Sequence, residues 1–233
     1  MKIALFGITN LPLGLHNLKD PRLDQADALV PADKMTYAKV EVATDKDIPT
    51  ADAILCSRAV FSDLLMLDLE FVETRLGRGP EAAEKVVLEQ LAEALVSEIP
   101  VCRAGLTPEK LAAISAHNFT TSKSVTVAEE AELAAPEPLL LRAFSEAGFI
   151  SFLTVGGKEN RAWPIRAGLT AWEAAGTIHT DIQKGFIRAE IISFPDFIAA
   201  GGETEAKRAG KQRLELKTYI MQDYDLTNFR FNK

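Results

Sequence analysis

The chain has 233 residues, of which 47% are hydrophobic and 25% are charged, so it can bury a core and form one large domain or two smaller ones. It contains no run of eighteen apolar residues, and its first eighteen residues carry one Lys and no small-residue cleavage site, so we expect no membrane span, no signal peptide and a cytoplasmic location. The net charge of -7 argues against nucleic-acid binding by the whole surface, but residues 151–233 hold 12 Lys and Arg against 10 Asp and Glu, which indicates separate domains with separate partners.

The opening segment resembles the strand, loop and helix that begin a nucleotide-binding domain. Residues 1–7 form a short buried-strand pattern, and a loop follows from Gly7 to Gly14. A phosphate-binding loop needs a second Gly, a Lys that neutralises the phosphates and a Ser or Thr that holds Mg²⁺. Here Pro12, Leu13 and Gly14 stand at those three positions, with Asn10 inside the loop. We therefore expect no bound cofactor at this loop.

The next residues predict a connecting segment and two strands. The stretch 17–33 is polar and is interrupted by Pro21 and Pro31, so we expect no helix there. The stretch 37–43 alternates like a half-exposed strand, and residues 53–57 read as a short buried one.

From Ser62 the apolar spacing becomes helical. Leu65, Leu69, Val72 and Leu76 recur at intervals of four, three and four, and the spacing resumes at Leu88 after a Gly-Pro turn. This pattern predicts a helical hairpin, whose leucine stripe is either its own seam, which we favour, or a partner-binding face. A third helix is expected at 107–109, with Thr as N-cap and Pro at the first helical position.

The remaining elements predict a small mixed sheet. A strand at 124–128 and a helix at 138–147 come first. Strands at 149–155 and 161–165, a helix near 171–176, a strand at 185–192, a helix around 195–200 and closing strands at 219–222 and 228–231 then follow. This succession suits a ubiquitin-like β-grasp domain.

A run of motifs in the last eighty residues is similar to one known family. The motifs, in chain order, are Phe152-Leu-Thr-Val-Gly156, Arg161-Ala-Trp163, Ala174-Ala-Gly-Thr-Ile-His-Thr-Asp181, Gly185-Phe-Ile-Arg-Ala189, Ala209-Gly-Lys-Gln-Arg213, Gln222-Asp223 and Phe229-Arg-Phe-Asn232. They resemble the terminal, TGS-type domain of the YchF / Obg-like ATPase family. Weaker similarity in the segments 22–42, 68–78 and 119–123 extends the resemblance over nearly the whole chain.

The resemblance implies a reduced P-loop-like α/β body with a helical hairpin insertion, followed by a TGS-type β-grasp domain, which is an α/β plus α+β fold. We expect residues 1–60 and 120–147 to form the body, 61–119 the hairpin insertion and 148–233 the β-grasp domain. The family's chemistry is missing at several points. Its Asp-x-x-Gly motif aligns with residues 44–47, where Asp45 is out of register and Gly is absent, and its base-reading Asn meets Ala128-Glu129-Glu130.

Candidate binding residues lie in the C-terminal part. His179 either stacks on or hydrogen-bonds a nucleobase, or ties a helix end to a strand through Asp181. The local excess of positive charge comprises Lys184, Arg188, Lys207, Arg208, Lys211, Arg213 and Lys217. These residues either contact phosphates, aided by an exposed aromatic such as Tyr219 or Trp172, or form a solvated face balanced by neighbouring Glu residues.

Other polar residues favour ordinary structural roles. The carboxylate pairs Asp45/Asp47 and Glu129/Glu130 lack further ligands at metal spacing, so we expect solvated charges and no metal site. Cys56 and Cys102 are expected to be reduced, half-buried thiols. Trp163 and Trp172 are expected to pack in the core.

The leading hypothesis is a non-hydrolysing relative of the Obg-like ATPases that presents its C-terminal domain to RNA, the ribosome or a protein partner, with no DNA specificity. A second is a nucleotide-binding enzyme in which Lys19, Lys34 or Lys46 replaces the lost cation. A third is a structural homo-oligomer that buries the hairpin stripe.

Overall fold

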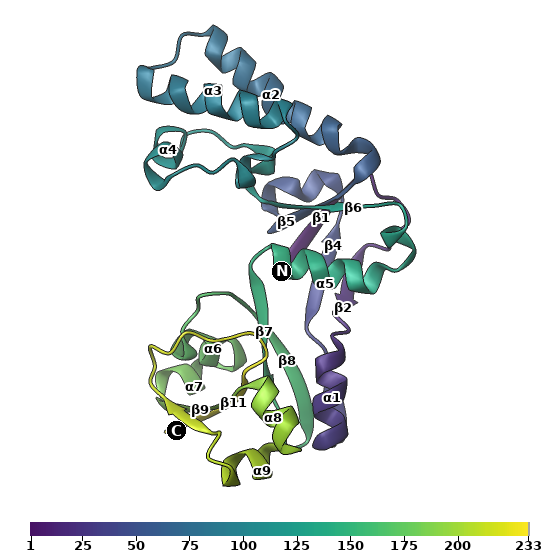
Figure 1. Cartoon of the computed structure of the whole chain (residues 1–233), viewed down its shortest axis with the longest axis vertical. Helices are drawn as coiled ribbons and strands as arrows, with labels where there is room; N and C mark the ends of the chain where they lie inside the picture. The colour runs from purple at the N-terminus through teal and green to yellow at the C-terminus, as the bar shows by residue number, and fades with distance from the viewer. Residues whose placement is uncertain (233) are drawn as a thin grey trace. The chain divides into compact units, whose positions relative to one another are not determined.

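The computed structural model describes residues 1–232 and divides into two compact units. The N-terminal unit comprises Met1–His16 and Val40–Ala147, and the C-terminal unit comprises Asn17–Lys39 and Gly148–Lys233. Each unit contains its own sheet and its own helices, as the element colours and labels of Figure 1 show. The predicted mixed α/β class is confirmed.

The sheet of the N-terminal unit has the strand order β2-β4-β1-β5-β6. Its strands are β1 (Lys2–Phe6), β2 (Gly14–Asn17), β4 (Lys39–Ala43), β5 (Ala53–Ser57) and β6 (Ser124–Ala128). β1 is parallel to β4 and β5, and β5 is parallel to β6. Strands covered on both faces read as continuous apolar runs, and the five residues of β5 are all buried.

The loop after β1 leads to a strand, where the resemblance to a nucleotide-binding domain implied a helix. β2 begins at Gly14, and α1 (Pro21–Leu29) follows it as the first helix of the described chain. The strand, loop and helix unit is therefore absent. Because a phosphate is held partly by N–H groups at a helix N-terminus, its absence removes part of the anion site.

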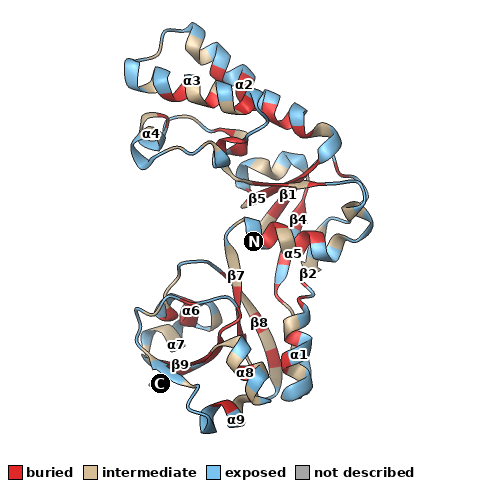
Figure 2. Cartoon of the chain, in the orientation of Figure 1, coloured by how far each residue is buried: buried red, intermediate tan, exposed pale blue. Residues whose placement is uncertain are grey.

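Four helices accompany the N-terminal sheet: α2 (Phe61–Gly77), α3 (Ala82–Val96), α4 (Pro108–Ala113) and α5 (Pro136–Glu146). α2 and α3 form the predicted hairpin, and the leucine stripe is buried between them and the sheet. Figure 2 shows this stripe as a red band along α2 and α3. The seam interpretation is confirmed, so the stripe is not available to a second copy of the chain. α4 begins as predicted, with the Thr107 side chain accepting a hydrogen bond from the Lys110 N–H.

A buried carboxylate ties the hairpin to the segment that leaves it. Asp68 of α2 has 2% of its surface exposed and accepts hydrogen bonds from the Thr120 N–H, the Thr121 N–H and the Thr121 hydroxyl at 2.7–2.8 Å. A buried carboxylate is tolerated only where such donors replace water.

The sheet of the C-terminal unit has the order β10-β9-β11-β7-β8-β3. Its strands are β3 (Lys34–Thr36), β7 (Phe149–Thr154), β8 (Glu159–Arg166), β9 (Phe186–Ile192), β10 (Arg213–Glu215) and β11 (Leu226–Phe231). The helices are α1, α6 (Ala171–Ile178), α7 (Thr180–Lys184), α8 (Phe194–Ala200) and α9 (Glu203–Arg208). Phe152 and Phe197 are its largest fully buried side chains.

Two expectations about the secondary structure of this unit are wrong. Residues 21–29 form α1, because Asp20 accepts a hydrogen bond from the Arg22 N–H as N-cap and Pro21 stands at the first helical position, where proline needs no N–H partner. Residues 219–222 form no strand but one isolated bridge between Thr170 and Ile220. Residues 17–39, which the prediction assigned to the N-terminal body, pack in the C-terminal unit.

Candidate functional site

A pocket of about 450 Å³ opens beside the loop that follows β1. It lies at the carboxyl ends of β1 and β4, the side on which parallel α/β sheets bind their ligands. Leu5, Ile8, Leu11 and Leu13 supply most of its lining, together with Gly7, Thr9, Thr44 and Asp45. The structure thus keeps a pocket at the expected position and lines it mainly with apolar side chains.

Gly7 is required here by packing and by backbone conformation. Its φ is +68°, and a Cβ atom at this position would lie 2.1 Å from the Val60 Cγ2 atom. No real Cβ contact is that short, so any other residue must displace Val60. The glycine therefore serves the close approach of Val60, which explains its presence without a phosphate.

The other residues of the loop differ in how closely they are held. The Nε2 atom of His16 lies 2.6 Å from the Pro12 carbonyl oxygen and holds the far end of the loop. Gly14 has a φ of +107° with open space around it. Leu13, at the position of the phosphate-binding Lys, is 58% exposed.

The pocket does not fit a nucleotide triphosphate with Mg²⁺. Among the described residues that line it, Asp45 is the one charged residue, and a carboxylate repels phosphate. Asp47 is engaged elsewhere, since it accepts a hydrogen bond from the Thr44 hydroxyl at 3.1 Å and lies 3.6 Å from the Lys2 Nζ atom. Within residues 1–232, no group of three or more His, Cys, Asp or Glu side chains is arranged to hold a metal ion.

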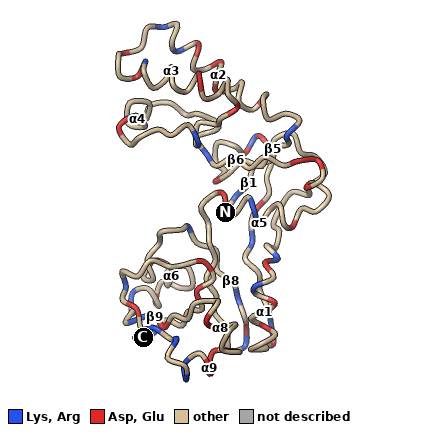
Figure 3. Tube along the Cα trace, viewed as in Figure 1, with Lys and Arg blue, Asp and Glu red and all other residues tan. Residues whose placement is uncertain are grey.

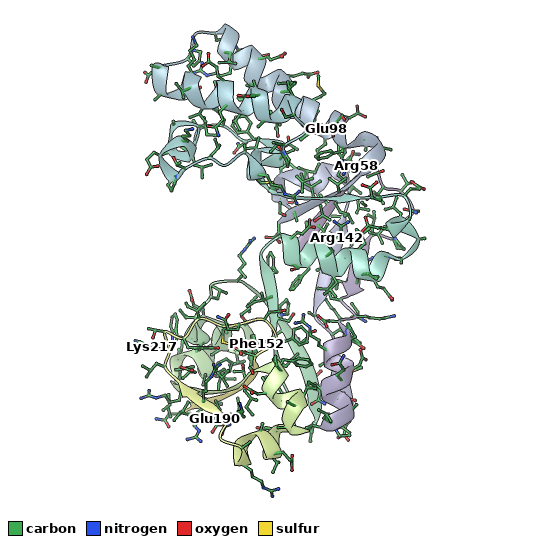
Figure 4. All side chains as sticks on the ribbon, viewed as in Figure 1. Arg58, Glu98, Arg142, Phe152, Glu190 and Lys217 are labelled. Carbon is green, nitrogen blue, oxygen red and sulfur yellow. The ribbon has the colours of Figure 1, made fainter. Side chains whose placement is uncertain are left out.

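A second, polar pocket lies at the carboxyl ends of β5 and β6, with Arg58 after β5 and Glu129 after β6. The Glu129 carboxylate lies 3.0 Å from the Arg58 Nε atom, and both side chains are at least half exposed. Figure 4 labels Arg58, Glu98 and Arg142 in this part of the N-terminal unit. Glu129 belongs to the segment 128–130 at which the sequence resemblance leads one to expect a base-reading Asn.

Two further arginines of this pocket close the edge of the sheet. Arg103 donates to the Val125 carbonyl and Arg142 to the Val127 carbonyl, both on the outer strand β6. Their charges are balanced by Glu146 and Glu132. Unpaired edge carbonyls invite other strands, so these arginines have a protective role. Sequence reasoning missed them because no motif joins residues so far apart.

The predicted basic residues of the C-terminal unit fall into two sets. Lys207 pairs with Glu203 at 2.6 Å, Arg208 with Glu205 at 3.5 Å, Lys211 with Asp196 at 3.0 Å and Arg213 with Glu215 at 3.4 Å. Lys184, Arg188 and Lys217 have no ion pair within the described chain, and Arg188 donates to the neighbouring Ile187 carbonyl. Figure 3 shows the corresponding alternation of blue and red along the C-terminal unit.

This division bears on both readings of the basic cluster. The four paired residues fit a solvated face on which opposite charges offset each other. Lys184, Arg188 and Lys217 are the predicted basic residues that have no ion pair within the described chain. Figure 4 places Lys217 at the periphery of the unit.

His179 caps a helix. It stands at the N-cap of α7, where its Nδ1 atom accepts a hydrogen bond from the Asp181 N–H at 3.1 Å. The bond to the Asp181 N–H therefore holds His179 against the first turn of α7. The side chain is also 62% exposed, which leaves the rest of the ring available to a ligand.

The aromatic residues are distributed differently from the prediction. Trp163 packs in the core, stacked on Phe152 with an interplanar angle of 13°, but Trp172 is 43% exposed, so its predicted core position is wrong. The backbone N–H of Trp172 donates to the backbone carbonyl of Lys217, so the two residues are neighbours in the main chain of the C-terminal unit. Tyr219 is held by Asp225 and Arg213, and burial together with the bond to Asp225 raises its pKa to about 12.

Both cysteines are free thiols. Cys56 is buried and Cys102 is exposed, so the expectation that both are half-buried is wrong. Burial raises the pKa of Cys56 to about 12, which makes its thiolate rare at neutral pH. No helix in the described part of the chain is long and apolar enough to cross a membrane.

Comparison with known proteins gives matches that are strongest in the C-terminal unit. The family model YchF-GTPase_C, described as a protein of unknown function (DUF933), matches residues 149–232. The ribosome-binding ATPase YchF of Haemophilus influenzae is 57% identical over 82 residues, which cover 35% of this chain and 23% of that protein. Obg-like ATPase 1 of Oryza sativa is 43% identical over 104 residues, which cover 44% of this chain and 26% of that protein. The chain therefore covers about a quarter of these relatives.

Two comparisons extend over most of the chain. The ribosome-binding ATPase YchF of Bacillus subtilis is 28% identical over 94% of this chain and 77% of that protein. The solved structure of the Schizosaccharomyces pombe YchF GTPase superimposes with a TM-score of 0.74 at 17% identity, covering 99% of this chain and 97% of that one. At this identity the superposition shows a shared fold.

Proposed function

Because this chain belongs to the YchF family of Obg-like ATPases, we propose that it is a non-hydrolysing, cytoplasmic member whose C-terminal unit, a TGS-type β-grasp domain, binds RNA on the ribosome. The observation that carries the proposal is the contrast between the two units. The C-terminal segment shares 57% of its residues with a ribosome-binding relative, while the pocket after β1 lacks the parts that bind phosphate.

The contacts in the C-terminal unit support RNA as the ligand. Lys184, Arg188 and Lys217 have no carboxylate partner in the described chain, and the backbone of Trp172, whose side chain is exposed, is hydrogen-bonded to the backbone of Lys217. Cations that neutralise phosphates and an aromatic ring that stacks on bases are the two parts of a single-stranded RNA surface.

The absence of hydrolysis rests on the N-terminal unit. Hydrolysis needs a phosphate-binding Lys and a carboxylate that organises Mg²⁺. Leu13 stands for the Lys, no helix follows the loop, and Asp47 is engaged by Thr44 and Lys2. The residues that line the pocket favour an apolar ligand over a triphosphate.

A nucleotide bound by other contacts is the second candidate, and the observation in its favour is the position of the pocket at the carboxyl ends of β1 and β4. Of the lysines considered as replacements, Lys46 lies next to Asp45 of the pocket lining. Lys34 is paired with Glu159 at 2.9 Å in the C-terminal unit.

Co-sedimentation with ribosomes tests the first proposal. We expect the chain to sediment with ribosomes at about 50 mM salt and to be released at about 300 mM, because phosphate contacts release counterions. Lys217→Glu should weaken the association more than Arg208→Glu, although both change the net charge equally, because Arg208 is already balanced by Glu205. If both variants lose ribosome association equally, the effect depends on net charge and not on Lys217. If the parent chain does not sediment with ribosomes, the proposal is wrong.

Calorimetric titration with ATP and GTP in Mg²⁺ separates the two candidates. We expect no heat of binding at micromolar nucleotide. Micromolar binding that Lys46→Ala abolishes would establish the second candidate instead.

A further inference from the structure

The C-terminal unit contains a pocket to which the names of the related proteins assign no role. It lies between α7 and the end of β11, with the side chains of His179, Asp181, Ile182 and Lys184 on one side and Phe231 and Asn232 on the other. Its volume of about 770 Å³ falls in the range of small-molecule sites.

The floor of this pocket is fixed by a close backbone contact. The Asn232 N–H donates to the Gly185 carbonyl at 2.9 Å, and a Cβ atom on Gly185 would lie 2.0 Å from the Asn232 carbonyl oxygen. The Gly185 N–H is itself bonded to the Asp181 carbonyl. Because these backbone groups already have hydrogen-bond partners, a peptide strand cannot pair with them. The same bonds hold the pocket in shape before a ligand binds.

The floor is apolar and partly aromatic. Phe231 is 36% exposed and lies opposite Phe186 in the ladder between β11 and β9. Together with Ile182 it provides a surface on which a planar ring can stack.

The rim provides one donor, one cation and one acceptor. Since the Nδ1 atom of His179 accepts the Asp181 N–H, the proton of the neutral ring is on Nε2, which has no partner among the described residues and can donate to a ligand. Lys184 is exposed and has no ion pair within residues 1–232. The Asp181 carboxylate, 72% exposed, can accept from a hydroxyl or an amino group.

We propose that this pocket receives one nucleotide of single-stranded RNA, with the base against Phe231 and Ile182 and the phosphate at Lys184 and the His179 Nε2–H. The Asp181 carboxylate accepts a hydrogen bond from the ribose 2′-OH, which distinguishes RNA from DNA. The inference rests on the proposed function and assigns its RNA contact to particular residues.

The test measures binding of a fluorescently labelled, single-stranded RNA of about twelve nucleotides by anisotropy, using the full chain. Three variants change the pocket. Phe231→Leu removes the aromatic ring and keeps an apolar side chain, Lys184→Glu reverses the cation, and His179→Asn keeps an N-cap acceptor for the Asp181 N–H but removes the Nε2 donor. Lys158→Glu, on the exposed turn between β7 and β8, is the matched charge control.

We expect each pocket variant to weaken RNA binding about tenfold, the scale of one lost stacking or phosphate contact, and Lys158→Glu to change it less than threefold, roughly. A DNA strand of the same sequence should bind more weakly than the RNA. Amide chemical shifts of ¹⁵N-labelled protein should move with RNA at residues 179–185 and 231–232, and circular dichroism should show that the variants are folded.

The outcomes separate the inference from the proposed function. If the parent binds ribosomes and RNA and the three pocket variants bind as tightly as the parent, the pocket assignment is wrong while the function stands. Displacement of the RNA by an equal concentration of AMP or UMP, or a shift of the same amides by a peptide and not by RNA, would also overturn the assignment. If the parent binds neither ribosomes nor RNA, the proposed function itself is wrong.

Discussion

Substitution of Gly7 by Ala tests whether this glycine serves packing or a ligand. The new Cβ atom must adopt a φ of +68° and would start 2.1 Å from the Val60 Cγ2 atom. The left-handed conformation costs an Ala residue about 1 to 2 kcal/mol, and displacing a packed side chain costs about 1 to 3 kcal/mol more. We therefore expect Gly7→Ala to lower the free energy of unfolding by about 2 to 5 kcal/mol.

Urea denaturation of matched variants separates the two contributions. Gly79 has the same φ of +68° and no atom within 4 Å of an added Cβ, so Gly79→Ala should show the backbone cost alone, about 1 to 2 kcal/mol. In Gly7→Ala combined with Val60→Ala the clash is absent, so the double variant should be more stable than the sum of the single losses predicts. Equal losses for Gly7→Ala and Gly79→Ala, with additive behaviour of the double variant, would refute the packing explanation.

Three further predictions concern the hairpin and the thiols. Asp68→Ala leaves the buried N–H groups of Thr120 and Thr121 without an acceptor and should cost about 2 to 4 kcal/mol in urea denaturation, while Glu70→Ala on the exposed side of the same helix should cost under about 0.5 kcal/mol. Hydrogen bonds from Arg75 and then His117 lower the pKa of Glu84 from 4.5 to about 2, so its contribution to stability is complete above pH 4.5 and is lost as the pH falls toward 2. The difference in melting temperature between the parent and Glu84→Gln should therefore shrink between pH 5 and pH 2, and a constant difference would contradict the ion pair. A thiol reagent should label Cys102 in the native protein and Cys56 only after denaturation, and equal labelling rates for both would contradict the burial of Cys56.

Strongly periodic segments could be predicted because burial alone determines them. The strand at 53–57 is apolar from Ala53 to Cys56 and buried throughout, and the stripe containing Leu65 and Leu88 lies in the hairpin seam. The cap at Thr107 was equally readable, since the cap, the proline and the carboxylate stand in the order that a helix start requires.

The helix at 21–29 and the irregular segment 219–222 were not predicted because their residues favour different structures at different positions. Pro21 breaks a helix in its interior but favours one at its first position, and the Asp20 cap decides between the two. Residues 219–222 are mostly apolar and aromatic, as in a strand, yet the Tyr219 hydroxyl and the Gln222 N–H donate to Asp225, and the segment makes one isolated bridge at Ile220.

The candidate site could be predicted only in part. The pairs of Lys207 with Glu203 and of Arg208 with Glu205 join residues one turn apart on α9 and are readable in the sequence, whereas the pair of Lys211 with Asp196 depends on how the chain folds. The pocket at His179 requires Phe231 from a strand more than fifty residues later, so no local motif could show it.

The residues that build the sheet of the N-terminal unit differ from those that a phosphate-binding loop uses to bind phosphate. The order β2-β4-β1-β5-β6 depends on buried strands such as β1 and β5, whose Ile3, Ala4 and Leu55 need only apolar neighbours. Phosphate binding depends on a Lys, a hydroxyl and a helix N-terminus, none of which contributes to that core. Because the two sets of residues do not overlap, a loop with Pro12 and Leu13 leaves the sheet intact, and Gly7 can be retained for the sake of Val60. Stability measurements on Gly7 variants and nucleotide titrations of the parent chain therefore test independent properties of the same loop.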